Sequence, residues 1–511
     1  MIAKTYSIIP DGFNGSTIEI EGDRRHGLPG LNIVGMANKT VSEARERVKS
    51  AICSSGFIFP DDRVTINLAP AELEKNGTHL DLAIALNILI LSNQLQQKDL
   101  ADSIFVGELS LDGSIRPVSG IINVVESAKK AGFERVFVPD KNFAQASLIK
   151  NIELVRVTDL STLFLYLKGQ LNLPLNPTVV KNTRTPVEPL LSLDQIQGQT
   201  LAKRALEIAV AGHHNILLYG PPGTGKTMLA KSALSLLPPL NSEEIISVTK
   251  IHALTGSTSI VNQRPFCTPH HTSTLPSIIG GGPRALPGEI SLAHLGILFL
   301  DELPEYPRQI IEALRQPLED RQISIMRAKK RVVYPADFML IATMNPCPCG
   351  YLGDEHKPCM CTSSQIQNYQ KKLSGPFLDR IDLFTNVNRI KTSELFQSKP
   401  QTSKSTSPIE SVVKNNITGA IKLQHYRYQN STLYNASLST SQIQKHISLD
   451  YSVKSFLDHA ASSLDLSARS YFKILKVART IADLEQSQSI TRSHIAEALS
   501  FRQFSFQPSH F

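Results

Sequence analysis

Tryptophan is absent from this 511-residue chain, and aromatic residues make up only 6% of it. Surfaces that hold single strands by base stacking use many aromatic rings, so this composition disfavours such a surface. Long apolar runs are also absent: the longest, Leu80–Leu91, contains Asp81 and Asn87, and a membrane span needs about 20 apolar residues. Met1–Gly12 contains no apolar signal region. We therefore expect a cytoplasmic protein with no membrane partner.

Charge of both signs is present, with a modest excess of basic residues. The formal net charge is +8, from 53 lysine and arginine residues against 45 aspartate and glutamate residues. A basic balance suits an anionic partner such as nucleic acid, although a solvated basic surface gives the same count. The length favours roughly two to four domains over a single one.

Two polar, proline-containing stretches divide the chain. Such segments bury little apolar surface and are typical of linkers. They predict a first domain over 1–171, a linker over 172–190, a central domain over 191–396, a linker or connector over 397–435, and a C-terminal domain over 436–511.

Apolar patterns predict α/β folds for the first two domains and a helical C-terminal domain. In the central domain, short uninterrupted apolar runs alternate with helical segments, which is typical of buried parallel strands. The strands expected there are Asn215–Leu218, Ile297–Leu300 and Met339–Thr343. In the first domain, the expected strands are Val64–Leu68 and Val136–Pro139, and the expected helices are Val41–Ile52 and Leu80–Leu91. The chain is expected to end in the helices Ala468–Glu485 and His494–Arg502.

The most specific motif is GPPGTGKT, which follows the predicted strand 215–218 and opens a predicted helix over 228–236. In this setting glycines let backbone amides turn toward the phosphates of a nucleotide, and the helix N-terminus reinforces the site. Lys226 is expected to reach the β- and γ-phosphates, and the Thr227 hydroxyl to hold Mg²⁺. The predicted nucleotide-binding residues are Gly220, Pro221, Pro222, Gly223, Thr224, Gly225, Lys226 and Thr227.

Polar side chains follow two further predicted strands. After the run 297–300, Asp301 suits the carboxylate that holds Mg²⁺, and Glu302 suits the base that polarises the attacking water. Asn345 follows the run 339–343 and can orient that water beside the γ-phosphate. A structural asparagine turn before proline is the alternative for Asn345. Together with Lys226, these residues predict a catalytic site for ATP hydrolysis.

The chain has only six cysteines, and four of them form two Cys-x-Cys pairs. In a large cytosolic protein such a cluster indicates metal binding or structure before disulfides. The thiolates of Cys347, Cys349, Cys359 and Cys361 can close a tetrahedral Zn²⁺ site. Reduced structural thiols are the alternative.

The segment Gln322–Tyr334 alternates between apolar and polar residues, as a β-hairpin does. Basic residues gather near its tip, where Arg327, Lys329 and Lys330 are candidates for contacts with DNA phosphates. Such contacts bind nucleic acid without reading its sequence. A solvated hairpin tip is the alternative.

Several motifs, taken together and in order, resemble the YifB/ComM family of Mg chelatase-like AAA+ ATPases, and the resemblance extends over nearly the whole chain. The matching stretches are DQIQGQ at 194–199, GPPGTGKT at 220–227, RPFCTPHHTS at 264–273, GGGPRALPGEISLAHLGILFLDELPEY at 280–306, RQPLED at 315–320, MNPCPCG at 344–350, SGPFLDRID at 374–382 and LSARSYFKILKVARTIADLE at 466–485.

The resemblance implies roles for further residues. Arg380 resembles an arginine finger that completes the site of a neighbouring subunit, with a local ion pair to Asp379 or Asp382 as the alternative. Arg469 resembles the sensor 2 residue of a C-terminal helical lid. Gln199 lies in the segment that is near the adenine in such ATPases. A homohexameric AAA+ ring that uses ATP and Mg²⁺ is therefore expected.

The first domain resembles the ribosomal-protein-S5-like fold of the Lon protease domain, through the segment Gly107–Gly132. A Lon-type site needs a serine nucleophile activated by a lysine. By this match His79 stands in place of the serine and Ile122 in place of the lysine. Neither side chain can take that role, so an active protease is not expected.

Two classes of function are compatible with the resemblance. ComM-like proteins are DNA helicases that promote branch migration during homologous recombination and natural transformation, which makes branched or single-stranded DNA the expected partner. The alternative is a Mg chelatase-like remodelling ATPase that acts on a protein partner. The Lon-like first domain and the lack of the DxSxS motif of integrin-type metal domains favour the DNA motor.

Overall fold

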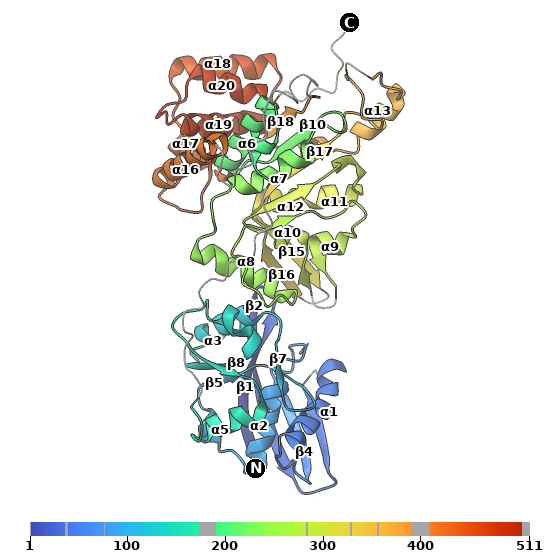
Figure 1. Ribbon diagram of the computed structural model, residues 1–511, viewed down its shortest axis with the longest axis vertical. Coiled ribbons are helices and arrows are strands. Elements are labelled where there is room, and N and C mark those ends of the chain that lie inside the picture. The colour runs from blue at the N-terminus through green and yellow to red at the C-terminus, as the bar shows by residue number, and fades with distance from the viewer. Residues whose placement is uncertain are drawn as a thin grey trace.

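The computed structural model describes residues 2–35, 39–75, 77–172, 191–282, 285–327, 330–354, 357–389 and 408–502. The chain is elongated, with the N-terminal domain at one end, an α/β body in the middle and the C-terminal helices at the other end (Figure 1). Within these ranges, no helix has both the length and the apolar character needed to cross a membrane.

The N-terminal domain contains a four-stranded sheet with the order β1-β2-β4-β3. Its strands are β1 (Ile2–Asp11), β2 (Asn14–Arg25), β3 (Gly30–Val34) and β4 (Arg63–Ala69). Helix α2 (Asp81–Leu91) contacts β1, β2 and helix α1 (Lys39–Ser54), and all of its residues are buried. Its apolar run is therefore a core helix. The helices predicted over 41–52 and 80–91 and the strand over 64–68 are confirmed.

A second, parallel sheet with the order β5-β8-β9 completes this domain. Its strands are β5 (Ser103–Phe105), β8 (Arg135–Pro139) and β9 (Glu153–Val157), and β6 (Glu108–Leu109) pairs with β7 (Ile115–Arg116) beside it. The helices are α3 (Ile121–Lys130), α4 (Phe143–Ala146) and α5 (Leu160–Leu167). The strand predicted over 136–139 is confirmed.

The central body is built on a five-stranded parallel sheet with the order β11-β14-β17-β10-β18. The strands are β10 (Ile216–Tyr219), β11 (Phe266–Cys267), β14 (Ile297–Leu300), β17 (Met339–Met344) and β18 (Leu383–Asn386). Every residue of β14 and β17 is buried, so their sequences are continuous apolar runs rather than alternating ones. The three predicted strands of this domain are confirmed, with one-residue shifts at some ends.

Helices and a hairpin surround this sheet. The helices are α6 (Thr200–Gly212), α7 (Lys226–Leu236), α8 (Ser242–Leu254), α9 (Leu275–Ile279), α10 (Glu289–Leu292), α11 (Arg308–Ala313), α12 (Arg315–Asp320), α13 (Ser363–Gln370) and α14 (Gly375–Leu378). The predicted hairpin is confirmed as β15 (Gln322–Arg327) and β16 (Lys330–Pro335), and β12 (Gly280–Gly281) pairs with β13 (Leu286–Pro287).

The C-terminal part is helical, as predicted, but it begins earlier than expected. Its helices are α16 (Pro408–Tyr428), α17 (Thr440–His446), α18 (Tyr451–Ser463), α19 (Ala468–Leu484) and α20 (Arg492–Ser500). The linker or connector predicted over 397–435 missed α16, which packs on α6 and α19 through Ile417, Ala420 and Ile421. The polar, proline-rich beginning of the segment hid this helical spacing of apolar residues.

The N-terminal domain contacts the central body through α3, α8 and the β1–β2 turn. Glu126 lies 2.6 Å from Lys250, and the Lys250 ammonium group is 3.9 Å from the ring centre of Phe13. The Gly120 amide also donates to the Ala253 carbonyl at 2.8 Å. Phe13 packs into the same apolar cluster as the hairpin strands. These contacts bring the N-terminal domain against the hairpin.

Candidate nucleotide-binding site

The GPPGTGKT loop joins the end of β10 to the beginning of α7. Gly225 precedes the first residue of α7 with φ at 88°, a conformation that glycine adopts without cost. At Gly220, φ is 154°, and a Cβ atom would lie 2.3 Å from the Val387 carbonyl oxygen. A residue with a side chain is therefore excluded at Gly220, both by the backbone conformation and by the lack of space for a Cβ atom. The loop is thus held in a turn whose amides precede a helix N-terminus, as phosphate binding requires.

Lys226 brings two of the predicted segments together. Its ammonium group donates to the carbonyl oxygens of Gly220 and Pro221 at 2.7 and 2.8 Å. It also donates to the Asn345 side-chain oxygen at 3.1 Å. Burial lowers the pKa of Lys226 to about 8, although the charges of Asp301 and Glu302 raise it. The cation is thus partly desolvated at the point where the end of β17 meets the loop.

Thr227 and Asp301 form the second connection of the site. The Thr227 hydroxyl lies 3.1 Å from an oxygen of Asp301, whose other oxygen accepts a hydrogen bond from Thr343. Hydroxyl and carboxylate oxygens are the ligands that Mg²⁺ takes, so these two residues fit that ion. The chemistry that Mg²⁺ supplies, when it is bound, is neutralisation of phosphate charge.

Glu302 occupies an unusual backbone position at the end of β14. Its φ is 52°, in the left-handed region that is costly for residues other than glycine, and its amide donates to the Thr343 hydroxyl at 3.0 Å. Its side chain is exposed. Strain of this kind persists where the surroundings hold it, and it gathers at functional sites. The turn directs Glu302 away from the buried strand, next to Asp301.

Gln199 lies beside the same loop. It directly precedes α6, with φ at 53°, and its side-chain amide donates to the Asn388 carbonyl at 2.6 Å and to the Thr224 carbonyl at 3.4 Å. The structure therefore brings Gln199, the loop, Asp301, Glu302 and Asn345 into one region.

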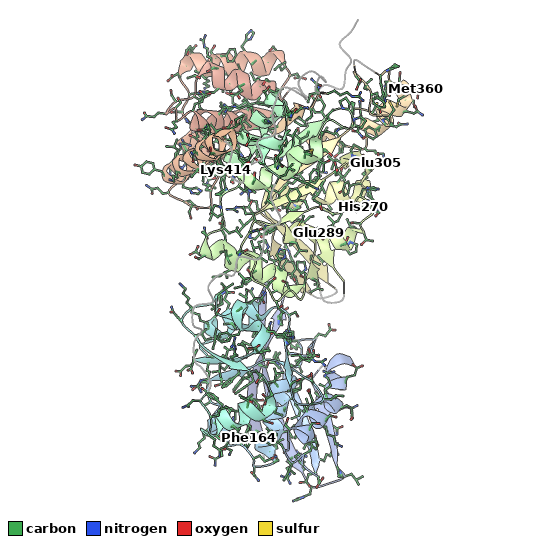
Figure 2. All side chains as sticks on the ribbon, viewed as in Figure 1. Phe164, His270, Glu289, Glu305, Met360 and Lys414 are labelled. Atoms are coloured by element: carbon green, nitrogen blue, oxygen red, sulfur yellow. The ribbon has the colours of Figure 1, made fainter. Side chains whose placement is uncertain are left out.

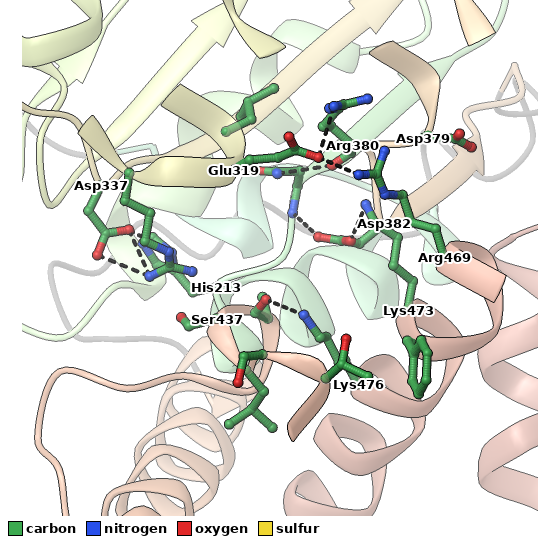
Figure 3. Close-up of a pocket in the computed structure, with 18 of the residues that line it drawn as sticks. His213, Glu319, Asp337, Asp379, Arg380, Asp382, Ser437, Arg469, Lys473 and Lys476 are labelled. Atoms are coloured by element: carbon green, nitrogen blue, oxygen red, sulfur yellow. Dashed lines mark hydrogen bonds and ion pairs between the residues drawn. The ribbon is translucent and has the colours of Figure 1, made fainter. Parts of the chain in front are cut away.

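The two predicted arginines lie together at a different place. Arg380 and Arg469 share one oxygen of Glu319, at 2.8 and 2.6 Å, in a pocket of about 570 Å³ (Figure 3). Arg380 is largely buried, whereas Arg469 is half exposed. In the part of the chain that is described, no ion pair or hydrogen bond joins either arginine to the loop 220–227.

A buried ion pair fixes the segment that carries Arg380. Asp382 lies 2.7 Å from Lys473 of α19 and accepts a hydrogen bond from the Asn215 amide at 3.0 Å. Burial alone would raise the pKa of Asp382, but the charge of Lys473 and hydrogen bonding with His214 hold it well below its ordinary value. The carboxylate thus ties α19, which begins next to Arg469, to the segment before β18.

Sequence reasoning did not assign Glu319, Thr343 or the pair Asp382–Lys473. Glu319 lies inside the motif RQPLED, and its carboxylate is the only chemical signal that could have singled it out. The partner of Arg380 is this residue, and neither Asp379 nor Asp382, which were the expected alternatives. Asp379 instead lies 3.8 Å from Arg502.

The hairpin is amphipathic across its two faces. Ile323, Ile325, Val332 and Tyr334 are buried, and the Tyr334 hydroxyl donates to the Ala285 carbonyl at 2.8 Å. Met326, by contrast, is 77% exposed. Arg327 and Lys330 are paired across the end of the hairpin, and Lys329 lies outside the described residues. The register therefore sets the first and last of the three basic positions opposite each other.

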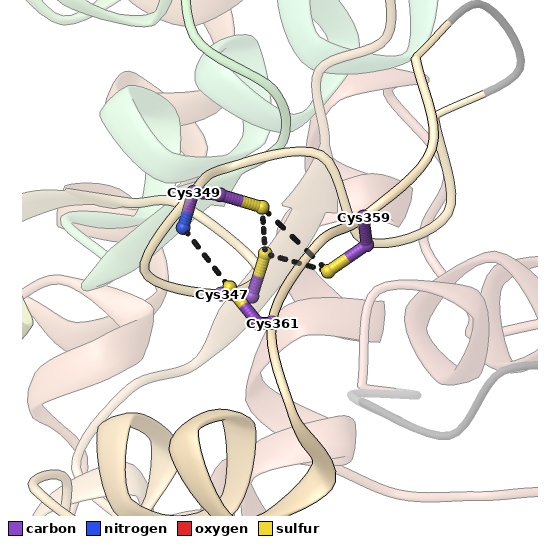
Figure 4. Close-up of side chains that lie close together, drawn as sticks. All are labelled: Cys347, Cys349, Cys359 and Cys361. Carbon is purple, nitrogen blue, oxygen red and sulfur yellow. Dashed lines mark hydrogen bonds between the residues drawn. The ribbon is translucent and has the colours of Figure 1, made fainter.

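The four clustered cysteines meet as predicted from their spacing. The sulfur atoms of Cys347, Cys349, Cys359 and Cys361 all lie within 4.8 Å of one another (Figure 4). All four thiols are free.

In the N-terminal domain, the two positions compared with Lon have structural surroundings. Ile122 is completely buried in α3. His79 is nearly buried, and its Nε2 lies 2.7 Å from the Ser119 carbonyl oxygen.

Comparison with known families agrees with these features. Residues 192–395 match the family described as "Magnesium chelatase, subunit ChlI". Residues 20–142 match "Subunit ChlI of Mg-chelatase", and residues 409–502 match "Magnesium chelatase, subunit ChlI C-terminal". The three matches fall in part of the N-terminal domain, in the central body and in the C-terminal helices.

Individual relatives extend over nearly the whole chain. The protein is 42% identical over 496 residues to YifB of Salmonella typhimurium, covering 96% of this chain and 95% of that protein. It is 40% identical over 506 residues to the competence protein ComM of Haemophilus influenzae, covering 98% and 97%. A shorter match, 23% identical over 137 residues, is to the Lon protease of Mycolicibacterium smegmatis, covering 26% and 17%.

The parallel sheet and the glycine-rich loop before α7 define a P-loop ATPase of the AAA+ class. With relatives at this identity over nearly its whole length, the chain belongs to the Mg chelatase-like family that includes YifB and ComM. Membership of this family implies ATPase activity, with ATP and Mg²⁺ as the nucleotide and the metal.

Two substitutions separate nucleotide binding from hydrolysis. Lys226→Ala should weaken ATP binding about 10- to 100-fold, because a hydrogen-bonded charge contributes about 1.5–3 kcal/mol. Glu302→Gln should retain ATP and lower turnover by about 10²–10⁴-fold, because only water activation is lost. Equilibrium binding and steady-state hydrolysis would be measured on both variants. The control is Glu305→Gln, an exposed carboxylate nearby (Figure 2), which should behave as wild type. Near-normal turnover in Glu302→Gln would exclude this role.

The depressed pKa of Lys226 predicts a pH-dependent affinity. Burial lowers the pKa of Lys226 to about 8. Phosphates bind the protonated form, so we expect binding at full strength below this pH and weaker binding above it. The expected loss is about tenfold per pH unit above pH 8. Affinity for ATP would be measured from pH 7 to 9.5. Lys226→Arg is the control, because arginine stays charged and its profile should be flat. A flat wild-type profile would contradict the assignment.

Proposed function

We propose that the protein is an ATP-driven DNA motor that works as a homohexameric ring. It acts as a helicase and promotes branch migration of DNA during homologous recombination and natural transformation, as its resemblance to the YifB/ComM family implies. The observation that carries this proposal is the 40% identity to ComM over nearly both chains. The connected P-loop, Asp301 and Asn345 supply the ATPase site that such a motor requires.

Within this proposal each site residue has a role. Lys226 and the loop amides bind the phosphates, Thr227 and Asp301 hold Mg²⁺, and Gln199 borders the adenine. Glu302 polarises the attacking water and Asn345 orients it. The hydrogen bond between Asn345 and Lys226, at 3.1 Å, supports this arrangement, because it puts both side chains at the end of the phosphate-binding loop.

The arginines act in the site of a neighbouring subunit. Arg380 and Arg469 contact the same carboxylate, Glu319, and lie apart from the loop of their own subunit. Two guanidinium groups converging on one oxygen form a cationic site that suits a phosphate, which is also a multivalent oxygen anion. A neighbour's γ-phosphate would then compete with Glu319 for both arginines.

The hairpin contacts DNA through Arg327, Lys329 and Lys330. Its apolar face packs into the body, which anchors the hairpin. In a ring, six such hairpins would gather basic residues around one axis. The low aromatic content also suits a motor that holds phosphates rather than stacked bases.

The outer domains have supporting roles. Residues 1–171 form a ribosomal-S5-like, Lon-like domain without protease activity, because His79 and Ile122 are unsuited to a serine–lysine dyad. Residues 436–511, extended by α16, form the helical lid, which contacts the body through α6 and α19. The cellular setting is the cytoplasm.

A shared active site predicts that two inactive variants restore each other. Arg380→Ala retains its own P-loop, and Lys226→Ala retains its own arginines. Each alone should hydrolyse ATP slowly, since an arginine finger contributes about 10³–10⁵ in rate. In an equimolar mixed ring, about a quarter of the head-to-tail interfaces join the P-loop of an Arg380→Ala subunit to the intact Arg380 of a Lys226→Ala subunit. The mixture should therefore recover hydrolysis.

The mixing experiment has two checks. Wild-type hydrolysis per subunit should rise with protein concentration, because the ring assembles by mass action. Mixing Lys226→Ala with Glu302→Gln should give no recovery, since no subunit of that mixture keeps both Lys226 and Glu302. If Arg380→Ala hydrolyses ATP normally as a monomer, the proposal of an active site shared between subunits is wrong.

Removing the charge at the hairpin should separate ATP use from strand movement. With Arg327, Lys329 and Lys330 all changed to alanine, basal hydrolysis should persist, while branch migration is lost. The salt dependence of DNA binding should flatten, by about 0.9 in the logarithmic slope for each phosphate contact removed. Branch migration, hydrolysis and DNA affinity would be measured at two salt concentrations.

The matched control changes three exposed lysines of the N-terminal domain, Lys98, Lys141 and Lys150, to alanine. This variant loses the same charge and should still migrate branches. Intact branch migration in the hairpin variant would remove the hairpin from the mechanism. If wild-type protein neither moves branched DNA nor hydrolyses ATP faster with it, the DNA motor fails and a protein-remodelling ATPase becomes the better explanation.

A further inference from the structure

The cysteine cluster has the geometry of a metal site. Cys347 lies 3.4 Å from Cys349 and 3.6 Å from Cys359, and Cys349 lies 3.6 Å from Cys359, measured between sulfur atoms. A disulfide would need about 2.05 Å. Four thiolates around one Zn²⁺ at about 2.3 Å would be about 3.8 Å apart. The cluster therefore matches a tetrahedral set of ligands around a single ion.

A backbone amide is directed at one of these sulfur atoms. The Cys349 amide donates to the Cys361 sulfur at 3.4 Å. A hydrogen bond of this kind stabilises negative charge on sulfur, and the thiolate is the form that binds metals. This contact therefore suits a thiolate at Cys361.

Ligand type and spacing select the metal. Four sulfur ligands in a tetrahedral arrangement suit Zn²⁺ or an iron–sulfur cluster. A cluster of several irons would hold its cysteines further apart than the 4.8 Å limit seen here. Met360, labelled in Figure 2, lies between Cys359 and Cys361 and is 90% exposed, so the site lies close to the protein surface.

The cysteine loop begins directly after the strand that delivers Asn345. Cys347 is two residues beyond Asn345. A Cβ atom on Gly350 would lie 2.7 Å from the Pro222 ring and 3.8 Å from the Asn345 side chain. The loop therefore lies directly against the phosphate-binding loop.

The far end of the loop supports Asn345 as well. Cys361 is followed by Thr362, which caps helix α13. The Gln370 side chain of α13 donates to the carbonyl of Pro346, the residue after Asn345, at 3.2 Å. A metal joining Cys347 to Cys361 would thus close a ring of contacts around Asn345.

We propose that Cys347, Cys349, Cys359 and Cys361 bind one Zn²⁺, and that this metal positions Asn345 against the phosphate-binding loop. The cysteines are positioning residues and take no part in the chemistry. Loss of the metal releases the loop, so Asn345 leaves its place beside Lys226. The positioning part rests on the proposed role of Asn345, whereas the metal content does not.

The metal content is tested first. Full-length protein purified without added metal should contain about one zinc per chain by elemental analysis. Cys359→Ser should lose most of it, and Cys359→His should keep it, because Cys₃His sites also hold zinc. Cys53→Ser, which removes an exposed thiol in the N-terminal domain, is the control and should retain full occupancy. Wild-type protein without zinc, even after Zn²⁺ is added back, overturns the proposal.

The positioning role is tested by comparing turnover with affinity. Chelation of the wild type, or Cys359→Ser, should lower kcat about tenfold or more while ATP affinity changes much less, because a small displacement of a catalytic group costs rate. Adding Zn²⁺ to the chelated wild type, and the Cys359→His substitution, should each restore kcat. Chelated wild type covers the case in which Cys359→Ser does not fold. Full kcat in metal-free protein would overturn the positioning role, and an equal loss of affinity and kcat would show general unfolding instead.

Discussion

Parallel pairing of β14, β17 and β10 decides where the nucleotide site lies. Parallel neighbours end at the same edge of a sheet, so Asp301, Asn345 and the loop beginning at Gly220 meet although they are far apart in the chain. Hydrogen bonds then join the three ends, through Lys226 to Asn345 and through Thr227 to Asp301. In open α/β sheets, ligands bind at this carboxyl edge. The C-terminal helices pack against the body that carries this edge, and the hairpin belongs to the same body.

The buried carboxylate of Asp382 is a charged link between the sheet and the C-terminal helices. It lies between Lys473 of α19 and the backbone just before β10. Breaking such a buried pair costs about 3–5 kcal/mol, because the remaining charge stays buried without a partner. Arg380 comes two residues before Asp382, Arg469 comes four residues before Lys473, and both arginines contact Glu319. Their shared position therefore depends on the packing of α19 against the sheet.

Local patterns were enough to predict the parts that depend on local chemistry. Continuous apolar runs predicted β14 and β17 because both faces of these strands are buried. The motif GPPGTGKT predicted the loop because each of its three glycines has a positive φ. Side-chain pairing across long distances has no such signal. The contact of Glu319 with Arg469 joins segments far apart in the chain, and the sequence of neither segment indicates which residue it contacts. Helix α16 was missed for a different reason, since its polar beginning outweighed the spacing of its apolar residues.

A single segment connects the arginine pocket to the hairpin. Helix α12 carries Glu319 and is followed at once by β15, and the Ala336 amide closes the base of the hairpin onto the Arg321 carbonyl at 2.8 Å. Arg321 also pairs with Asp337 at 3.0 Å, so the base is fixed by charge as well as by backbone. Under the proposed roles, a neighbour's phosphate that draws Arg380 and Arg469 away from Glu319 acts on the helix that precedes the hairpin. Because interfaces of this kind have discrete arrangements rather than a continuous range, that exchange of partners gives ATP binding a direct mechanical route to the hairpin.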